Sequence, residues 1–161
     1  MLRMNKLGSL FAVATILLAA PAYAGPNHAN EHTFGEPGKP ENVTRTVLVE
    51  AHDADGDMKF VHEPLEIRLG ETIKFVVTNK GEMPHEFALG DSPTQRAHAL
   101  MMEKMPDMKH HDDPSAVTLA PGETKEIVWT FNKPIQGYIE LACQMPGHYA
   151  GGMFSKVSLA K

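Results

Sequence analysis

A single cysteine and the donors that follow it place the strongest constraint on this chain. Cys143 is followed by His148 and Met153 at equal five-residue steps. The thiol continues the alternating apolar series of residues 138–142, which predicts a strand with Cys143 on its inward side. Proline and glycine between the three residues permit tight turns. The fold must therefore bring a thiol, an imidazole and a thioether together, a donor set that suits copper.

The first 24 residues have the features of an export signal. Arg3 and Lys6 precede an apolar stretch over 7–20, and Ala22-Tyr23-Ala24 forms an A-x-A cleavage site. The apolar stretch is too short for a good membrane anchor. We therefore expect cleavage after Ala24 and a soluble mature chain in a bacterial periplasm.

Charge and cysteine content narrow the range of partners. The formal charge of −5 becomes −7 once the signal, with its two basic residues and no acidic ones, is removed. An acidic chain is a poor partner for nucleic acid but is compatible with a cation or a basic protein. Exported proteins usually pair their cysteines. The unpaired Cys143 is therefore either buried and inert or protected by a metal.

Short β-patterned segments separated by Gly- and Pro-containing turns run from residue 45 to the end of the chain. Ile73, Phe75 and Val77, for example, share one face at period two. The pattern predicts one all-β sandwich or barrel domain over 44–161, with a helical insertion at about 92–114. Residues 25–43 have little apolar content, which predicts a flexible histidine-containing arm. The expected strands are 46–50, 58–62, 65–69, 72–78, 86–89, 116–119, 124–131, 138–142 and 154–159.

One more nitrogen donor must come from elsewhere in the chain, and His85 is the best candidate. The run Met83-Pro84-His85-Glu86 starts a predicted strand after a turn. Two histidines and one cysteine with a weak axial methionine form the type 1, or blue, copper site. Coordination would also keep Cys143 as a thiolate. The alternatives are hydrogen-bonded or exposed imidazoles for His85 and His148, and core packing for Met153.

These motifs resemble those of the cupredoxins, the plastocyanin and azurin family. The resemblance rests on Cys143-x₄-His148-x₄-Met153, on Pro84-His85 and on the β pattern, and it covers 45–161. It implies a Greek-key β-sandwich with a short helical insertion rich in Met and His. It also implies copper as the bound metal, with equatorial ligands at His85, Cys143 and His148 and an axial ligand at Met153.

Several details look closest to the CopI-type periplasmic copper-tolerance cupredoxins. They are the run 83–87, the Met/His-rich insertion, the run 146–149, and the arm with His32 followed by residues 34–38. One departure is visible. Many cupredoxins have Asn after the first histidine, where its side chain ties the ligand loops together, and this chain has Glu86. The loop-tying interaction is therefore not expected from the residue type.

A second group of soft donors crowds the insertion. On a helix over about 95–105, His98, Met101 and Met105 lie close to one face. Thioethers and imidazoles together suit Cu(I), which predicts a second copper site. The alternative is a methionine stripe that packs the helix onto the sandwich. The candidate ligands are His98, Met101, Met102, Met105, Met108, His110 and His111.

Four other histidines are weaker candidates for a surface copper site, with solvated side chains as the alternative. They are His28, His32, His52 and His62. The run Asp53-Ala54-Asp55-Gly56-Asp57 resembles a calcium loop, but the spacing to a closing glutamate does not fit. The run therefore predicts a hairpin turn.

Two functions fit these features. The Met/His insertion and the histidine arm favour copper tolerance, by capturing, oxidising or passing on periplasmic copper, with a copper-handling protein as partner. The type 1 site favours one-electron transfer between periplasmic redox proteins. We expect no enzyme and no catalytic residue, because the chain lacks the His-x-His pairs of a trinuclear copper cluster and the second Cys of a binuclear site. Slow oxidation of Cu(I) stays open.

Overall fold

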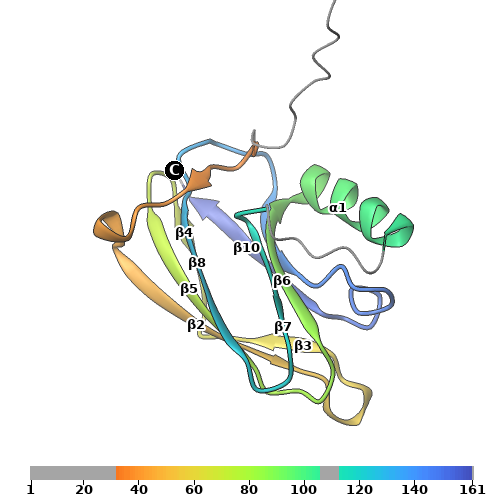
Figure 1. Ribbon diagram of the computed structural model, residues 1–161. Coiled ribbons are helices and arrows are strands. Elements are labelled where there is room, and N and C mark those ends of the chain that lie inside the picture. Colours follow the sequence, from red (N-terminus) through yellow and green to blue (C-terminus); the bar gives the residue numbers. More distant parts are fainter. Residues whose placement is uncertain (1–31, 106–112, 161) are drawn as a thin grey trace, which may run out of the picture.

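Two five-stranded sheets make up the domain in the computed structural model, which describes residues 32–105 and 113–160 (Figure 1). The strand orders are β1-β8-β5-β2-β3 and β4-β10-β9-β6-β7. This arrangement confirms the predicted all-β sandwich. The strands are β1 (Glu36–Pro37), β2 (Arg45–His52), β3 (Lys59–Val61), β4 (Ile67–Arg68), β5 (Thr72–Asn79), β6 (His85–Asp91), β7 (Ala116–Leu119), β8 (Thr124–Thr130), β9 (Tyr138–Ala142) and β10 (Phe154–Ala160).

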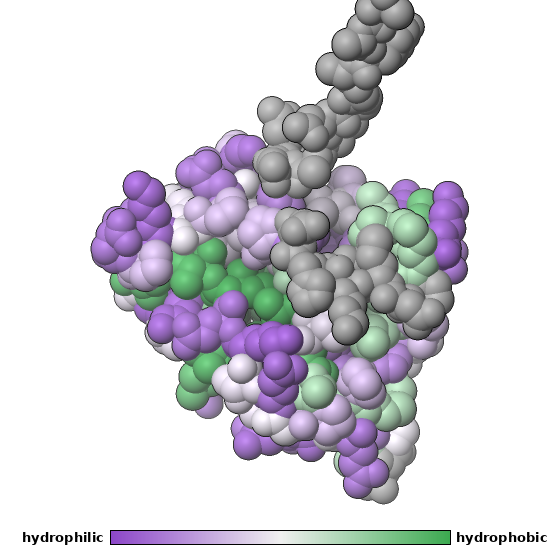
Figure 2. Space-filling view, viewed as in Figure 1, coloured by the Kyte–Doolittle hydropathy of each residue, from purple (hydrophilic) through white to green (hydrophobic). Residues whose placement is uncertain are grey.

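The core lies between the sheets and follows the alternation of the strands. Ile73, Phe75 and Val77 of β5 are all fully buried. Burying a large apolar side chain contributes roughly 1.5–3 kcal/mol, so these repeated inward series hold the sheets together. At one edge of the sandwich, Val117 of β7 and Ile127 of β8 line a groove. Figure 2 shows apolar side chains on this face, between the positions of β8 and β7 in Figure 1.

The ends of two parallel strands bring distant loops together. β2 and β5 pair in parallel, with Ala51 opposite Asn79 near their ends. The backbone N–H of Lys80 then donates to the carbonyl of Ala51 at 2.8 Å. The loop after β2 and the turn after β5 therefore leave the sheet side by side. That turn leads directly into β6, whose first residue is His85.

Helix α1 (Ser92–Lys104) confirms the predicted helical insertion and lies beside β6 (Figure 1). It begins at Asp91, whose carboxylate accepts a hydrogen bond from the Thr94 N–H at 3.1 Å, an N-cap that starts the helix earlier than expected. Its buried side chains are Gln95, His98 and Met102. β6 is buried along its whole length. Within 32–105 and 113–160, no helix is both long enough and apolar enough to cross a membrane.

Residues 32–43 pack onto the sandwich instead of forming a flexible arm. Phe34 is fully buried, and its ring stacks on Trp129 with 4.9 Å between centroids. Strand β1 pairs with β8 immediately afterwards. Gly35 permits the close approach, since a Cβ there would lie 2.1 Å from the carbonyl oxygen of Thr130. The flexible-arm prediction is wrong for these residues, because one aromatic anchor outweighs their polar composition; 1–31, including the predicted signal, lie outside the described residues.

Candidate metal centre

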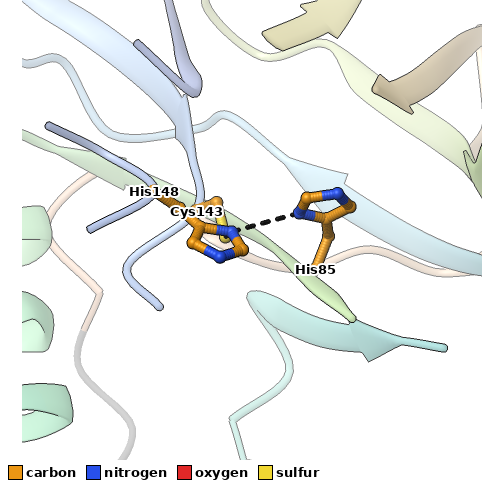
Figure 3. A group of neighbouring side chains, drawn as sticks. All are labelled: His85, Cys143 and His148. Atoms are coloured by element: carbon orange, nitrogen blue, oxygen red, sulfur yellow. Dashed lines mark hydrogen bonds between the residues drawn. The ribbon is translucent and has the colours of Figure 1, made fainter. Parts of the chain in front are cut away.

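Three of the predicted ligands meet at one end of the sandwich. His85 opens β6, Cys143 directly follows β9, and His148 lies in the loop before β10. His85 Nδ1 lies 3.2 Å from His148 Nδ1, and Cys143 Sγ lies 3.4 Å from the same His148 atom. Two imidazole nitrogens on one tetrahedral ion would be about 3.3 Å apart. The three donor atoms all lie within 4.8 Å of one another (Figure 3), so one ion could be bound by all of them. We call these three residues the metal centre.

Backbone hydrogen bonds close the loop that carries two of the predicted ligands. The N–H of Cys143 donates to the Met153 carbonyl at 3.0 Å, and the N–H of Met153 donates to the His148 carbonyl at 3.0 Å. The N–H of His148 donates to the Met145 carbonyl at 3.0 Å, in a turn where Gly147 has φ +86°. Such a φ favours glycine. These bonds return His148 to the thiol, as the motif predicted.

The backbone of Met153 lies beside the metal centre, because it is hydrogen-bonded to the backbones of Cys143 and His148. Its side chain is fully buried and belongs to the same apolar cluster as Cys143. A buried thioether can pack and ligate at the same time, because it is both apolar and a soft donor. The Met153 sulfur therefore remains the predicted axial ligand.

Burial sets the protonation states of the metal centre. Burial raises the pKa of the Cys143 thiol to about 12, although hydrogen bonds from backbone N–H groups oppose this rise. Burial lowers the pKa of His85 against the opposing effect of Asp53, and burial together with the charge of His85 lowers the pKa of His148. At pH 7 the centre therefore holds two neutral imidazoles and a neutral thiol. The imidazole lone pairs are ready to bind a cation, and the thiol releases its proton when a metal binds.

Glu86 ties the two ligand-bearing loops together. Its backbone N–H donates to Cys143 Sγ at 3.4 Å, and its Oε2 accepts a hydrogen bond from the Gln144 N–H at 3.1 Å. Its Oε1 lies 2.9 Å from His98 Nε2 on α1. The Glu86, Gln144 and His98 side chains are buried. The glutamate thus supplies the loop-tying contact that its residue type did not lead us to expect, and it adds a link to the helix.

The candidate ligands on α1 and directly after it face different surroundings. His98 is buried and contacts Glu86, Met102 is 3% exposed, and Met105 is 47% exposed. Met101 is half-buried. The remaining candidates, Met108, His110 and His111, lie outside the described residues. The second copper site therefore stays a prediction.

The weaker histidine candidates are not part of a metal cluster in the described parts of the chain. His32 packs edge-on against a tryptophan ring, His52 pairs with a glutamate, and His62 contacts a serine hydroxyl. His28 lies outside the described residues. Over 32–105 and 113–160, the metal centre is the only group of three or more His, Cys, Asp or Glu side chains whose ligand atoms lie close enough to share an ion.

One residue that contacts a ligand was missed by the sequence analysis. The run 53–57 does form a turn, with a short 3-10 helix η3 (Ala54–Gly56). Asp53 Oδ2, however, also lies 3.0 Å from His85 Nε2. Spacing gives no sign of this contact, since the two residues are 32 positions apart. The sequence offered one indirect sign, the aspartate-rich run 53–57, which fits neither a calcium loop nor the copper motif.

Known proteins with related sequences are described as copper proteins. The family model described as copper binding proteins, plastocyanin/azurin family, matches residues 46–160. The copper-resistant cuproprotein CopI of Rubrivivax gelatinosus is 40% identical over 158 residues, covering 92% of each chain. The CopI protein of Pseudomonas aeruginosa is 34% identical over 175 residues, covering 91% of this chain and 92% of that protein.

A solved structure supports the fold independently. Dithionite-reduced auracyanin from the photosynthetic bacterium Roseiflexus castenholzii has a TM-score of 0.58, covering 74% of this chain and 99% of that chain. At 20% identity this likeness concerns the fold alone. The family match over most of the chain, the CopI relatives and the sandwich lead to one assignment: the chain belongs to the plastocyanin/azurin family of copper-binding proteins.

Proposed function

We propose that this chain is a periplasmic protein that binds copper at His85, Cys143, His148 and Met153 and contributes to copper tolerance. The observation that carries the proposal is the convergence of two imidazole nitrogens and a cysteine sulfur within 4.8 Å. Histidine nitrogen with thiolate and thioether sulfur suits copper better than harder ions.

The residues of the metal centre also suit a metal that changes its oxidation state. Bound copper supplies one-electron exchange between Cu(II) and Cu(I). Neutral His85 and His148 offer lone pairs without charge repulsion, and Cys143 offers a thiolate after losing its proton. Glu86 and the backbone bonds of the 143–153 loop hold these donors in place. A held donor set needs little rearrangement when the charge of the ion changes.

Copper tolerance is supported by the relatives and by the composition. Both CopI relatives carry copper resistance in their names and align with more than nine tenths of this chain. The predicted export signal would place the chain where excess copper enters the cell. The Met- and His-rich region from His98 to His111 offers further soft donors. We infer a copper-capturing, non-enzymatic role.

Copper titration of the purified mature chain tests the binding site. Under anaerobic conditions we expect one tightly bound copper per chain, and Cys143→Ser should lose it. The matched comparison is a Met101→Leu/Met105→Leu/Met108→Leu variant, which leaves the buried Met102 in place. One copper that survives in this triple variant, with no further equivalents in the wild type, would contradict the second site. Full binding by Cys143→Ser would contradict the first.

Growth in copper tests the tolerance role. A deletion strain of the source bacterium should grow poorly in high copper, and the wild-type gene should restore growth. Cys143→Ser should fail to restore it, with equal periplasmic protein levels checked by immunoblot. Restoration by Cys143→Ser would contradict tolerance through this site.

Electron transfer is the second candidate function. His148 is half-buried, whereas His85 is fully buried, and Pro146 and Gly147 beside His148 are exposed. This surface could receive a redox partner at the edge of a ligand. A deletion strain that grows normally in high copper but respires poorly would favour electron transfer over tolerance.

A further inference from the structure

Asp53 lies where two loops meet beside the metal centre. Its carboxylate accepts hydrogen bonds from the backbone N–H groups of Glu82, at 2.9 Å to Oδ1, and of Met83, at 2.8 Å to Oδ2. The same Oδ2 lies 3.0 Å from His85 Nε2. The Asp53 side chain is 4% exposed, and the His85 side chain is fully buried. The contact is therefore shielded from water.

This contact decides which ring nitrogen of His85 carries the proton. The Asp53 carboxylate already accepts hydrogen bonds from the backbone N–H groups of Glu82 and Met83, so it acts as an acceptor here. Its contact with His85 therefore requires a donor, which places the imidazole proton on Nε2. The lone pair is then on Nδ1, the atom that lies 3.2 Å from His148 Nδ1. Asp53 thus presents the correct nitrogen to the metal centre.

We propose that Asp53 is a positioning residue of the metal centre that also stabilises Cu(II) relative to Cu(I). The inference rests on the proposed copper site. A carboxylate that accepts the second N–H of a ligating histidine fixes the ring and raises its basicity. A buried negative charge on the far side of the ring also favours the more highly charged ion.

Gly81 leaves the space that this arrangement needs. A Cβ built on Gly81 would lie 2.5 Å from the Asp53 carboxylate, too close for both to stay in place. The turn is also fastened by Asn79, which accepts from the Gly81 N–H at 2.8 Å and donates to the Met83 carbonyl at 2.8 Å. The shape of the turn therefore has its own support, and the contact of Asp53 with His85 is an additional feature.

The test compares Asp53→Asn with Asp57→Asn in the copper-loaded protein. Asparagine keeps the size of the side chain and can still accept from His85 Nε2, but it removes the charge. Asp57 lies in the same loop, its side chain is 64% exposed and pairs with Lys59, so Asp57→Asn removes an equal charge away from the metal centre. The measurements are Cu(II) and Cu(I) affinities by competition titration and the reduction potential by voltammetry.

We expect Asp53→Asn to bind Cu(II) about 10–100-fold more weakly than Asp57→Asn, with a smaller loss for Cu(I). Each tenfold fall in the Cu(II) affinity relative to the Cu(I) affinity raises the reduction potential by about 59 mV. Gly81→Ala, which keeps both charges but displaces the Asp53 carboxylate, should shift the potential in the same direction. Equal losses for both ions, or a potential equal to that of Asp57→Asn, would reduce Asp53 to a residue that fastens the turn and overturn the proposal.

A measurement on the unaltered protein covers the case in which Asp53→Asn does not fold. Nitrogen-15 NMR of the metal-free and the Cu(I)-loaded wild type should show His85 protonated on Nε2, with slow exchange of that proton. A proton on Nδ1 in the metal-free protein would overturn the proposal. Copper titration separates the two hypotheses: a wild type that binds no copper contradicts the proposed function, whereas bound copper without an Asp53-dependent potential contradicts only this inference.

Discussion

The metal centre and helix α1 both combine histidine with sulfur-containing side chains, but they place these donors differently. In the metal centre, the donor atoms of His85, Cys143 and His148 converge within 4.8 Å. On α1, His98 contacts a buried glutamate and Met102 is buried, while Met105, directly after the helix, is 47% exposed. Residue type alone therefore does not tell whether donor atoms converge.

The difference comes from what fixes each donor in space. β6 and β9 pair antiparallel with Ala88 opposite Ala142, so the start of β6 and the end of β9 lie at the same end of the sheet. Strand pairing thus brings His85 to Cys143, and a closed loop brings His148 to both. A helix fixes only the direction in which each side chain leaves its axis. Donor atoms on α1 could share one ion only with further donor atoms from another segment.

The largest expected difference between the two regions is the stability that copper adds: it should depend on the metal centre and not on the methionines of the α1 region. At free copper 1,000-fold above Kd, binding to the folded chain alone raises the free energy of unfolding by about 4 kcal/mol. We expect this rise in the wild type and in the Met101→Leu/Met105→Leu variant, and its absence in Cys143→Ser. Urea unfolding with and without copper measures it. A smaller rise in the methionine variant would show that α1 contributes to copper binding.

Glu86→Ala should destabilise both regions, because Glu86 joins them. The substitution leaves the Gln144 N–H and His98 without this buried carboxylate. Breaking a buried ionic contact by removing one partner costs about 3 kcal/mol or more in the free energy of unfolding. Glu86→Gln, which keeps the shape and one accepting oxygen, is the matched control and should cost less. Equal unfolding midpoints for the wild type and Glu86→Ala would show that Glu86 does not stabilise the link between the two regions.

The strands and the metal centre were predictable because both follow periodic or short-range patterns. Alternation predicted residues such as Phe75 as core, and Phe75 is fully buried. The equal spacing of Cys143, His148 and Met153 predicted a ligand loop, and the place of His85 after a turn and before a strand predicted a further donor. The structure brings His85, Cys143 and His148 together. These patterns are local in the sequence, whereas the convergence of His85 with Cys143 depends on the pairing of β6 with β9.

The contacts that support the metal centre were not predictable in the same way. Asp53 reaches His85 only because β2 and β5 pair in parallel and their following loops meet. Phe34 packs on Trp129 although its neighbours in the sequence are polar. Both contacts join residues that are distant in the sequence, and neither residue type implies such a partner.

Two methionines at the end of α1, one in its last turn and one directly after it, give a smaller test of the same contrast. Met102 is 3% exposed and Met105 is 47% exposed. Met102→Ala should lower the free energy of unfolding of the metal-free protein by about 2 kcal/mol, since it removes most of a buried side chain. Met105→Ala, the matched surface variant, should change it by about 0.5 kcal/mol or less. Equal effects in urea unfolding would contradict the assignment of Met102 to packing.

The smallest expected effect is the pH dependence that His98 gives to the metal-free protein. Burial disfavours its charge, but the hydrogen bond and charge of Glu86, with the charge of Asp113, outweigh burial and raise the pKa of His98 above 6.5. Stability from a raised pKa is complete below the unfolded value and is lost as the pH rises through the folded value. The stability advantage of wild type over His98→Gln should therefore be larger at pH 6 than at pH 8. In a Glu86→Gln background, the change in this advantage between pH 6 and pH 8 should shrink, because the carboxylate that raises the pKa of His98 is gone. An unchanged pH dependence in that background would mean that another group raises the pKa of His98.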